Sequence, residues 1–380
     1  MIIFASMFDR ILLFPYSLTL AMRNAIYKKG SKKVRKAGVP TICVGNITAG
    51  GTGKTPHTEM ILQMLLESDE WGARNIAMLS RGYKRGSKGF QQVMLDSSAA
   101  FCGDEPLQIK KKRPGVTVAV DKNRIEGCDF LVHPEKLQDS KAARKCVSKD
   151  MVPADIIVLD DAFQYRKLGA DLNIVLVDYN RPVTKDRLIP FGKLRDLPSR
   201  LKQADVIVVS KCPMYMEDAE KEAFAKVLKF KEYDPESCIG VRKKGQRQII
   251  LFSCVKYGQS VPIYESADPR YIYTQQVVLF SGIAKDEPLC NYLSGKYKVI
   301  SHYSFPDHHR YTKKDIRKIS KVVSHNPTAA VATTEKDAQR VLDFQNMPQQ
   351  LKERMFMVPI TVDFISERER ELFRQIILSV

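Results

Sequence analysis

The stretch PTICVGNITAGGTGKTPHTEMILQMLLE, residues 40–67, places an apolar run, a glycine-rich loop and a helical segment directly one after another. Glycines let backbone amides turn inward around phosphate groups, and a helix that begins at the end of such a loop adds its positive N-terminal dipole. The order therefore predicts a strand, a phosphate-binding loop and a helix. We expect the loop to hold a nucleotide through Thr48, Ala49, Gly50, Gly51, Thr52, Gly53, Lys54 and Thr55.

The last two residues of this loop have separate expected tasks. We expect the Lys54 ammonium to reach the β- and γ-phosphates of ATP and to act in catalysis, and the Thr55 hydroxyl to ligate Mg²⁺. The strict pattern G-x-x-x-x-G-K-[ST] asks for glycine where Thr48 stands, so the match is imperfect at that position. The flanking strand and helix still supply the structural context that the pattern requires.

Apolar, β-branched runs recur along the chain with helical segments between them. Nearly continuous apolar runs are typical of strands buried on both faces, so they predict a parallel α/β sheet. The runs span 40–44, 75–80, 116–121, 155–160, 173–178 and 205–210, and, after a gap, 277–281, 298–303, 329–333 and 355–360. The fold class that we predict is an α/β core like that of P-loop nucleoside triphosphatases, plus a second, smaller α/β domain.

The gap between the two sets of runs has a different composition. Residues 237–264 carry five basic residues and no acidic ones, and two apolar runs around Gly245 have the pattern of a β-ribbon. We therefore divide the chain into an N-terminal segment (1–37), a P-loop core (38–236), a β-ribbon linker (237–276) and a smaller C-terminal α/β domain (277–380).

Two adjacent carboxylates, Asp160 and Asp161, end the apolar run DIIVLD. A phosphate loop needs an acidic residue at the end of a neighbouring strand to hold magnesium. Because the carboxyl ends of parallel strands meet at one edge of the sheet, we expect Asp160 or Asp161 to bind the metal together with Thr55. The sequence does not decide which of the two does so.

Single positions separate the classes of phosphate-loop protein. Guanine-specific proteins carry N-K-x-D after a late strand, whereas VVSKCP (208–213) has Lys211 but then Pro213 in place of the aspartate. Partition-type membrane ATPases carry a lysine at the start of the loop, where this chain has Ala49. These positions favour an ATP-dependent phosphotransferase, with a partition-type ATPase or another nucleotide switch as the alternative.

Positive charge is concentrated near the N-terminus. The chain has a formal net charge of +18, and residues 1–40 hold eight Lys or Arg against one Asp. Asp9, Arg10 and Pro15 interrupt the apolar stretch before it reaches the ~18 residues of a spanning helix, and its charges follow it, unlike those of a secretory signal. We expect residues 1–37 to lie in the headgroup region of an anionic membrane; a terminal core helix is the alternative.

The cysteines and the second basic cluster bear on the compartment of the protein and on whether it binds zinc or nucleic acid. Eight cysteines occur without a C-x-x-C pair, which argues against a zinc knuckle or a redox motif and favours a reducing cytoplasm. The basic residues 110–113 lack interleaved aromatic residues and any known nucleic-acid motif, so we expect no nucleic-acid partner. We also expect a monomer.

Eight short motifs occur in one order along the chain. They are VGNITAGGTGKTP (44–56), LSRGYKR (79–85), GDEP (103–106), LDDAFQYR (159–166), PFGKLRD (190–196), FSGIA (280–284), FPDHHRYT (305–312) and TTEKDA (333–338). Together they closely resemble the tetraacyldisaccharide 4′-kinase family over nearly the whole chain. The resemblance implies transfer of the ATP γ-phosphate, with Mg²⁺, to the 4′-hydroxyl of the lipid A disaccharide 1-phosphate. It also implies a peripheral enzyme on the cytoplasmic face of the Gram-negative inner membrane, with the site in a cleft between two domains joined by a β-ribbon.

The resemblance also implies roles for individual residues. Asp104, in GDEP, is implied to be the base that accepts the hydroxyl proton, and His308 its partner, although the adjacent His309 can exchange with it. Arg195 is implied to neutralise the transferring phosphate or to hold the substrate phosphate. Its neighbour Asp196 stands where many members have Glu, so no carboxylate role carries over to it.

Three further residues follow predicted strands that end near the loop. Arg81 and Tyr83 belong to the SRGY motif, and Arg124 follows VTVAVDKN. Because these strand ends share one edge of the sheet, we expect all three side chains to line the acceptor site.

Overall fold

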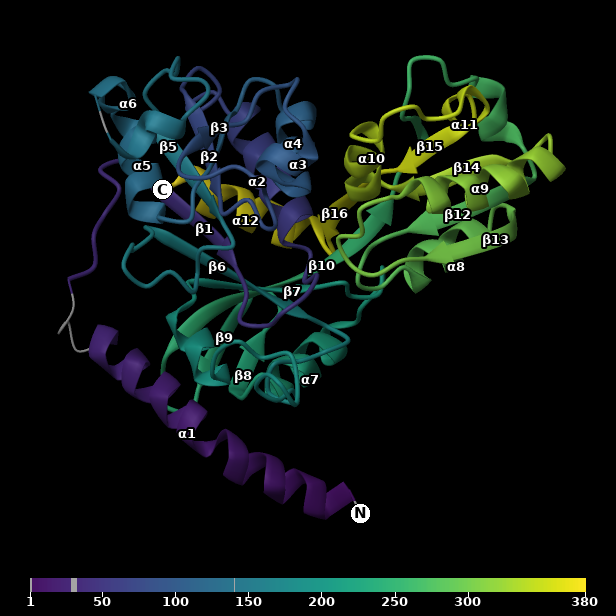
Figure 1. The fold of residues 1–380 in the computed structure, drawn as a ribbon. Coiled ribbons are helices and arrows are strands. Elements are labelled where there is room, and N and C mark those ends of the chain that lie inside the picture. Colours follow the sequence, from purple (N-terminus) through teal and green to yellow (C-terminus); the bar gives the residue numbers. More distant parts are fainter. Residues whose placement is uncertain (1, 29–32, 140) are drawn as a thin grey trace.

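Parallel strands in the order β4-β2-β5-β1-β6-β7-β10 form the centre of the larger of two sheets (Figure 1). The computed structural model describes residues 2–28, 33–139 and 141–380. The central strands are β1 (Thr41–Gly45), β2 (Ile76–Ser80), β4 (Thr117–Val120), β5 (Ile156–Asp160), β6 (Leu172–Asp178), β7 (Val206–Ser210) and β10 (Arg247–Tyr257). Antiparallel strands β3 (Gln91–Gln92), β9 (Ile239–Arg242) and β8 (Phe230–Asp234) extend its edges.

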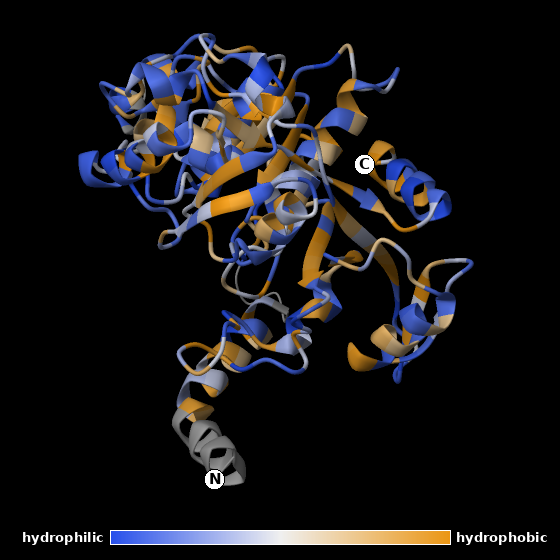
Figure 2. Ribbon diagram, turned by 90° about the vertical axis from the view of Figure 1, so that its right-hand side faces the viewer, coloured by the Kyte–Doolittle hydropathy of each residue, from blue (hydrophilic) through white to orange (hydrophobic). Residues whose placement is uncertain are grey.

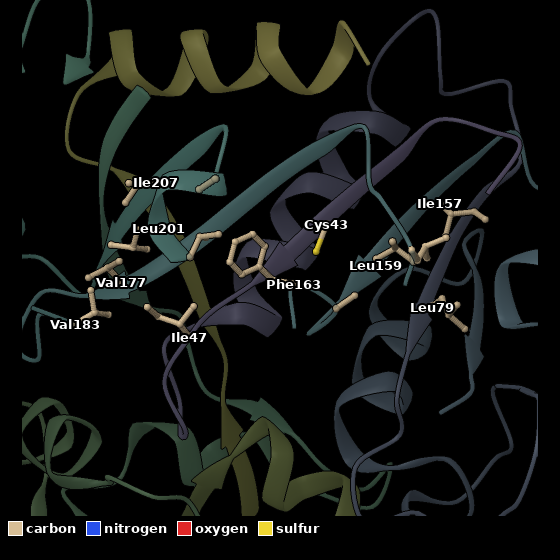
Figure 3. Packing of buried hydrophobic residues seen from close by; sticks show 14 of the residues in the cluster. Cys43, Ile47, Leu79, Ile157, Leu159, Phe163, Val177, Val183, Leu201 and Ile207 are labelled. Carbon is tan, nitrogen blue, oxygen red and sulfur yellow. The ribbon is translucent and has the colours of Figure 1, made fainter. Parts of the chain in front are cut away.

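Each apolar run that the sequence marks as a strand is a strand in the structure. The residues of β1, β2, β5 and β7 are buried throughout, as expected for strands that are covered on both faces. Alternate side chains face opposite layers, so Ile42 and Val44 join one apolar cluster while Cys43 joins the other. Figure 3 shows part of the second cluster, with Phe163 next to Cys43. The predicted parallel α/β fold class is confirmed.

Helices cover both faces of the larger sheet. They are α2 (Lys54–Leu66), α3 (Ala99–Cys102), α4 (Asp104–Lys112), α5 (Arg124–Val132), α6 (Lys136–Asp139) and α7 (Asp218–Val227), with 3-10 turns at Ala142–Lys145 and Pro198–Gln203. Hydrophobic residues are concentrated in the strands, and hydrophilic residues in the outer helices and loops (Figure 2). The chain thus buries its apolar runs between two helical layers.

A second, five-stranded sheet has the order β11-β15-β14-β12-β13. Its strands are β11 (Val261–Pro262), β12 (Gln276–Ser281), β13 (Lys298–Ser304), β14 (Ala330–Thr334) and β15 (Met355–Val358). Its helices are α8 (Glu287–Ser294), α9 (Lys313–His325), α10 (Glu335–Leu342) and α11 (Gln349–Lys352), and a 3-10 turn spans Pro269–Tyr273. Along β12, Val277 faces one apolar cluster and Val278 the other, so this sheet too is covered on both faces.

The long strand β10 connects the two units. It forms an antiparallel hairpin with β9 around Gly245, whose φ of +77° suits glycine, and its second half pairs with β16 (Ile360–Phe364). After β16, helix α12 (Glu367–Leu378) packs beside α2, with Phe373 in the core of the larger unit. Residues 360–378, which the sequence interpretation grouped with the smaller domain, therefore return to the larger sheet. The division of the chain into domains stays a prediction.

Helix α1 (Ile2–Lys28) extends away from the body of the larger unit (Figure 1). Its second half is attached through Leu20, which is buried, and through Asn24, whose side-chain amide donates to Asp196 at 3.3 Å. Within the described ranges, none of the helices has both the length and the apolarity needed to cross a membrane.

Replacing Phe373 by alanine tests whether α12 belongs to the core of the larger unit. We expect Phe373→Ala to lower the free energy of unfolding by about 3–5 kcal/mol, because the ring is fully buried. The only tryptophan, Trp71, lies in the same cluster, so its fluorescence during urea denaturation measures the unfolding of this unit. The exposed neighbour is the control, and Arg374→Ala is expected to change stability by less than about 0.5 kcal/mol. Equal stability of the two variants would show that α12 is not part of this core.

Candidate active site

The loop between β1 and α2 has the backbone geometry of a phosphate cradle. Gly50 and Gly53 have φ values of +99° and +84°, which residues with a side chain rarely adopt. The Asn46 side-chain amide donates to the hydroxyl of Thr52 at 2.7 Å, and the hydroxyl of Ser210 donates to the Thr52 carbonyl at 2.8 Å. The loop is therefore held in shape from both ends by buried hydrogen bonds.

The end of β1 lies unusually close to the loop that follows β5. A Cβ atom at Gly45 would overlap the Cβ of Phe163, so only glycine permits this approach. The approach brings Asp161, at the end of β5, beside the phosphate loop. Its Oδ1 lies 3.7 Å from the ammonium of Lys54.

The two carboxylates that follow β5 have opposite electrostatic properties. Burial raises the pKa of Asp160 to about 6, with Glu105 and Asp161 adding negative charge nearby. Burial also acts to raise the pKa of Asp161, but Lys54 and Arg195 outweigh it and lower that pKa below its ordinary value. Asp161 is therefore an anion at neutral pH, whereas the surroundings of Asp160 disfavour its charged form.

These residues fit a magnesium ion. The Oδ2 of Asp160 accepts a hydrogen bond from Ser80 at 3.2 Å, whereas its buried Oδ1 lacks a hydrogen-bond partner among the described residues. Thr55 is buried at the first turn of α2. A hydroxyl and one or two carboxylates are the kind of oxygen ligands that Mg²⁺ takes from a protein when phosphates and water supply the rest.

Arg195 reaches the same place from a different segment. Its backbone amide donates to the Ile47 carbonyl at 2.8 Å, which lays residues 193–195 along the phosphate loop. Its guanidinium donates to the Asn46 side chain at 2.6 Å, to the Thr48 carbonyl at 3.0 Å and to Asp161 at 3.3 Å. The next residue, Asp196, faces away from this site and forms a buried ion pair with Arg166.

Asp104 lies at the first turn of α4, where the smaller unit meets the larger one. The side chains of His308 and Arg340, both from the smaller unit, contact its Oδ2. His308 Nδ1 lies at 3.3 Å, and Arg340 donates from Nε at 3.0 Å and from Nη2. Burial acts to raise the pKa of Asp104, but His308, Arg340 and Lys336 together hold it well below its usual range. The Asp104 side chain is therefore a carboxylate at neutral pH.

Arg340 is a residue to which the sequence interpretation gave no role. It lies on α10, and its Nη1 also donates to Asp337 and to the Gly282 carbonyl, each at 2.7 Å. One turn earlier on α10, Lys336 forms an ion pair with Glu105. The i, i+4 spacing of two cations, one within the TTEKDA motif and one just after it, is the signal that points to a shared helix face.

The phosphate loop and Asp104 are electrostatic neighbours. Glu105, which follows Asp104, interacts with Lys54, and its own negative charge contributes to the raised pKa of Asp160. Sequence positions near 50, 105, 160 and 340 therefore meet at one place, at the carboxyl edge of the larger sheet.

The remaining predicted site residues are placed as follows. The ring of Tyr83 lies 5.0 Å from that of His308, and Arg81 is exposed nearby in the chain. Arg124 is only 2% exposed, and its guanidinium donates to the backbone carbonyls of Asp121 and Asp160. His309 turns away from Asp104, since its Nε2 lies 3.0 Å from Asp315.

Comparison with known proteins gives one consistent family. A family model described as Tetraacyldisaccharide-1-P 4′-kinase matches residues 6–379. A Tetraacyldisaccharide 4′-kinase of Parabacteroides distasonis is 34% identical over 373 residues, which cover 96% of this chain and 92% of the relative. One of Phocaeicola vulgatus is 33% identical over 94% of this chain and 90% of the relative. The crystal structure of the "apo" form of LpxK from Aquifex aeolicus in complex with ATP is similar with a TM-score of 0.67 and 26% identity, over 97% of this chain and 98% of that one.

Removing the guanidinium of Arg340 tests its hold on Asp104. We expect Arg340→Met to raise the pKa of Asp104, because Arg340 is, after the hydrogen bond of His308, the largest influence that opposes the effect of burial. The measurement is a ¹³C NMR titration of the Asp104 carboxyl carbon, assigned with Asp104→Asn. The control is Arg317→Met, which removes an exposed cation of α9. In this variant we expect the pKa of Asp104 to be unchanged. An unchanged pKa of Asp104 in Arg340→Met would show that Arg340 does not contact Asp104 in solution.

Proposed function

The chain belongs to the tetraacyldisaccharide-1-phosphate 4′-kinase family, and on that premise we propose which of its residues carry out the phosphoryl transfer. The enzyme transfers the γ-phosphate of ATP to the 4′-hydroxyl of the lipid A disaccharide 1-phosphate. Our assignment rests on one observation. The phosphate loop of the larger unit lies near the carboxylate of Asp104, and His308 and Arg340 of the smaller unit contact that carboxylate.

The phosphate side of the reaction belongs to the larger unit. The backbone of residues 48–55 surrounds the phosphates, and Lys54 neutralises the charge that develops during transfer. Thr55 and the two carboxylates Asp160 and Asp161 would hold Mg²⁺, which when bound neutralises phosphate oxygens. Arg195 lies beside Asp161 and the loop, so its guanidinium is close enough to share the charge of the transferring group.

The acceptor side centres on Asp104. A base with a lowered pKa is a weak one, but a loose phosphoryl-transfer transition state makes little demand on it. The hydroxyl becomes acidic only as its oxygen bonds to phosphorus, so a well-placed carboxylate suffices to receive the proton late in the step. His308 orients that carboxylate, and its φ of +60° fixes the ring where a side chain is rarely tolerated without tertiary support. Arg340 also positions the carboxylate, because it donates two hydrogen bonds to Oδ2.

Acceptor binding is assigned to residues beside this carboxylate. Tyr83 is 57% exposed next to His308, and Arg81 is exposed on the same loop, so both are accessible to a sugar or a phosphate. Contact of Arg124 with the substrate stays a prediction. Its burial and its bond to the Asp160 backbone favour a supporting role behind the metal site.

We further propose that α1 holds the enzyme on the cytoplasmic face of the inner membrane, as a monomer. Phe14, Leu18, Met22 and Ile26 follow one another at four-residue spacing and are 38–63% exposed. On a helix this spacing forms one apolar stripe, which suits insertion into the headgroup region, and the basic residues Lys33, Arg35 and Lys36 follow the helix. The buried Leu20 lies off this stripe and attaches the helix to the larger unit.

An acceptor-dependent kinase assay tests the catalytic assignments. With radiolabelled ATP and detergent-dispersed disaccharide 1-phosphate, Lys54→Ala is expected to lower turnover by about 10³-fold or more. Asp104→Asn and His308→Ala should each depress turnover while nucleotide affinity stays near that of the unchanged protein. Their double variant should be little worse than the poorer single one.

The matched control for this assay is Lys318→Ala, which removes an exposed cation from α9 and should leave turnover unchanged. ATP hydrolysis without labelled lipid would support a nucleotide switch instead. Near-normal turnover of Lys54→Ala would remove the loop from the mechanism, and fully multiplicative losses would show that Asp104 and His308 do not act as a unit.

The exposed stripe of α1 gives a separate test of membrane docking. We expect the triple variant Phe14→Gln, Leu18→Gln, Met22→Gln to bind anionic liposomes about 100-fold more weakly, because three apolar side chains no longer enter the bilayer. Flotation of vesicles measures the binding. The control removes two exposed side chains elsewhere, Met214→Gln with Tyr215→Gln, and should bind normally. If both proteins bind equally, membrane docking lies elsewhere.

A further inference from the structure

A cavity of about 790 Å³ lies where the second half of α1 meets the larger unit. Tyr27 of α1, Leu168 in the segment after β5, and Arg200 and Lys202 of the Pro198–Gln203 turn contribute to its wall. Its volume is within the range of sites that hold a small organic ligand, about 300–1,000 Å³. None of the functional residues named above for phosphoryl transfer lines it.

The wall of this cavity is cationic. Arg166, Arg200 and Lys202 line it, and among the described residues that do so, none is acidic. Asp196 lies behind the wall and pairs with Arg166, which offsets one of the three positive charges. Arg23 adds a further positive charge close enough to act on Arg200. The described residues that line the cavity therefore carry an excess of positive charge, of which Asp196 offsets part.

The cations of this wall are buried and incompletely hydrogen-bonded. The Arg166 side chain is 2% exposed, yet its Nε and Nη1 lack partners within the described parts of the chain, as does the Nε of Arg200. Burial, reinforced by Arg166, lowers the pKa of Arg200 to about 10, so it stays charged at neutral pH. These N–H atoms are themselves shielded, so the two guanidinium groups act on the cavity through their positive charge and not through these donors.

Part of the remaining wall is apolar, and uncharged polar residues such as Asn24, Tyr165 and Gln246 supply the rest. Phe163 and Leu168 line the cavity beside the guanidinium of Arg200, which also stacks on the Phe163 ring at 4.5 Å. The cavity opens at the root of α1, whose exposed stripe we assign to the bilayer surface. A ligand that suits both parts of the wall has an anionic head and an apolar body, as a lipid does.

We propose that this cavity binds the phosphodiester head group of an anionic phospholipid, at a site separate from that of the disaccharide acceptor. The inference rests on the membrane docking of α1 proposed above. An acceptor phosphate is disfavoured here because the acceptor's hydroxyl must reach Asp104, and Arg81, Tyr83 and Arg195 near that residue already offer it polar partners. Bound lipid would tie the root of α1 to the body and select an anionic leaflet.

Soluble short-chain lipids test this site without a bilayer. We expect the full-length protein to bind monomeric dihexanoyl-phosphatidylglycerol about tenfold more tightly than zwitterionic dihexanoyl-phosphatidylcholine, as measured by calorimetry without ATP or acceptor. Lys202→Glu, at an exposed position of the wall, should weaken phosphatidylglycerol binding by about tenfold, the effect of one charge-assisted contact. Ala25→Trp, which fills the cavity from α1, should abolish it.

The control for the charge change is Lys318→Glu on α9, which should bind both lipids normally. Equal affinity for the two lipids, or equal affinities of Lys202→Glu and Lys318→Glu for phosphatidylglycerol, would overturn the proposal. Competitive displacement of phosphatidylglycerol by the disaccharide 1-phosphate would also overturn it, because the cavity would then belong to the acceptor. Kinase activity of Lys202→Glu on detergent-dispersed acceptor should be unchanged. Loss of lipid binding can therefore be distinguished from a failure of the catalytic assignments.

Discussion

The carboxylate of Asp104 is the point on which the arrangement of the two units depends. It is buried at the start of α4, and a buried carboxylate is costly unless cations and hydrogen-bond donors meet it. Arg340 and His308, the two side chains that contact its Oδ2, both come from the smaller unit. The ion pair of Lys336 with Glu105 and that of Lys112 with Glu335, at 2.5 Å, add further ties between α10 and α4. Electrostatic compensation of one side chain therefore fixes how the smaller sheet faces the phosphate loop.

A second constraint acts within the larger unit, where the backbones of β1 and of the loop after β5 approach so closely that only glycine fits at position 45. This approach sets the two carboxylates that follow β5 in different surroundings although they are adjacent in sequence. Asp161 faces Lys54 and Arg195, and Asp160 faces the interior and Ser80. One strand end thus supplies an anion that is already neutralised by protein cations and a second carboxylate that gains most from a metal ion.

Much of this was predictable from local sequence. Short β-branched apolar runs such as IIVLD are typical of strands buried on both faces, and the order of strand, glycines and helix predicts the phosphate loop together with the edge where Asp160 lies. What depends on distant partners was not predictable. Arg340 meets Asp104 across 236 positions, and nothing in the local pattern of either residue indicates the other. The same holds for β16 and α12, because an alternating strand such as ITVDF fits the edge of either sheet, and only packing of Phe373 beside α2 selects the larger one. The cavity beside the second half of α1 is likewise built from five separate segments of the chain.

The positions of the membrane-facing and catalytic elements have a mechanical consequence. Helix α1 and the smaller unit lie at opposite ends of the larger unit (Figure 1), so the proposed membrane contact of α1 does not involve the interface between the two units. The ties of α10 to α4 are polar and partly accessible, and water can replace both partners of such pairs when they separate, which is not true of an apolar contact. Opening of the two units along this interface therefore costs less than unfolding either core. Because His308 and Arg340 belong to the smaller unit, the proposed base has both of these contacts only where the two units meet, so its orientation depends on an interface that is less costly to separate than a core.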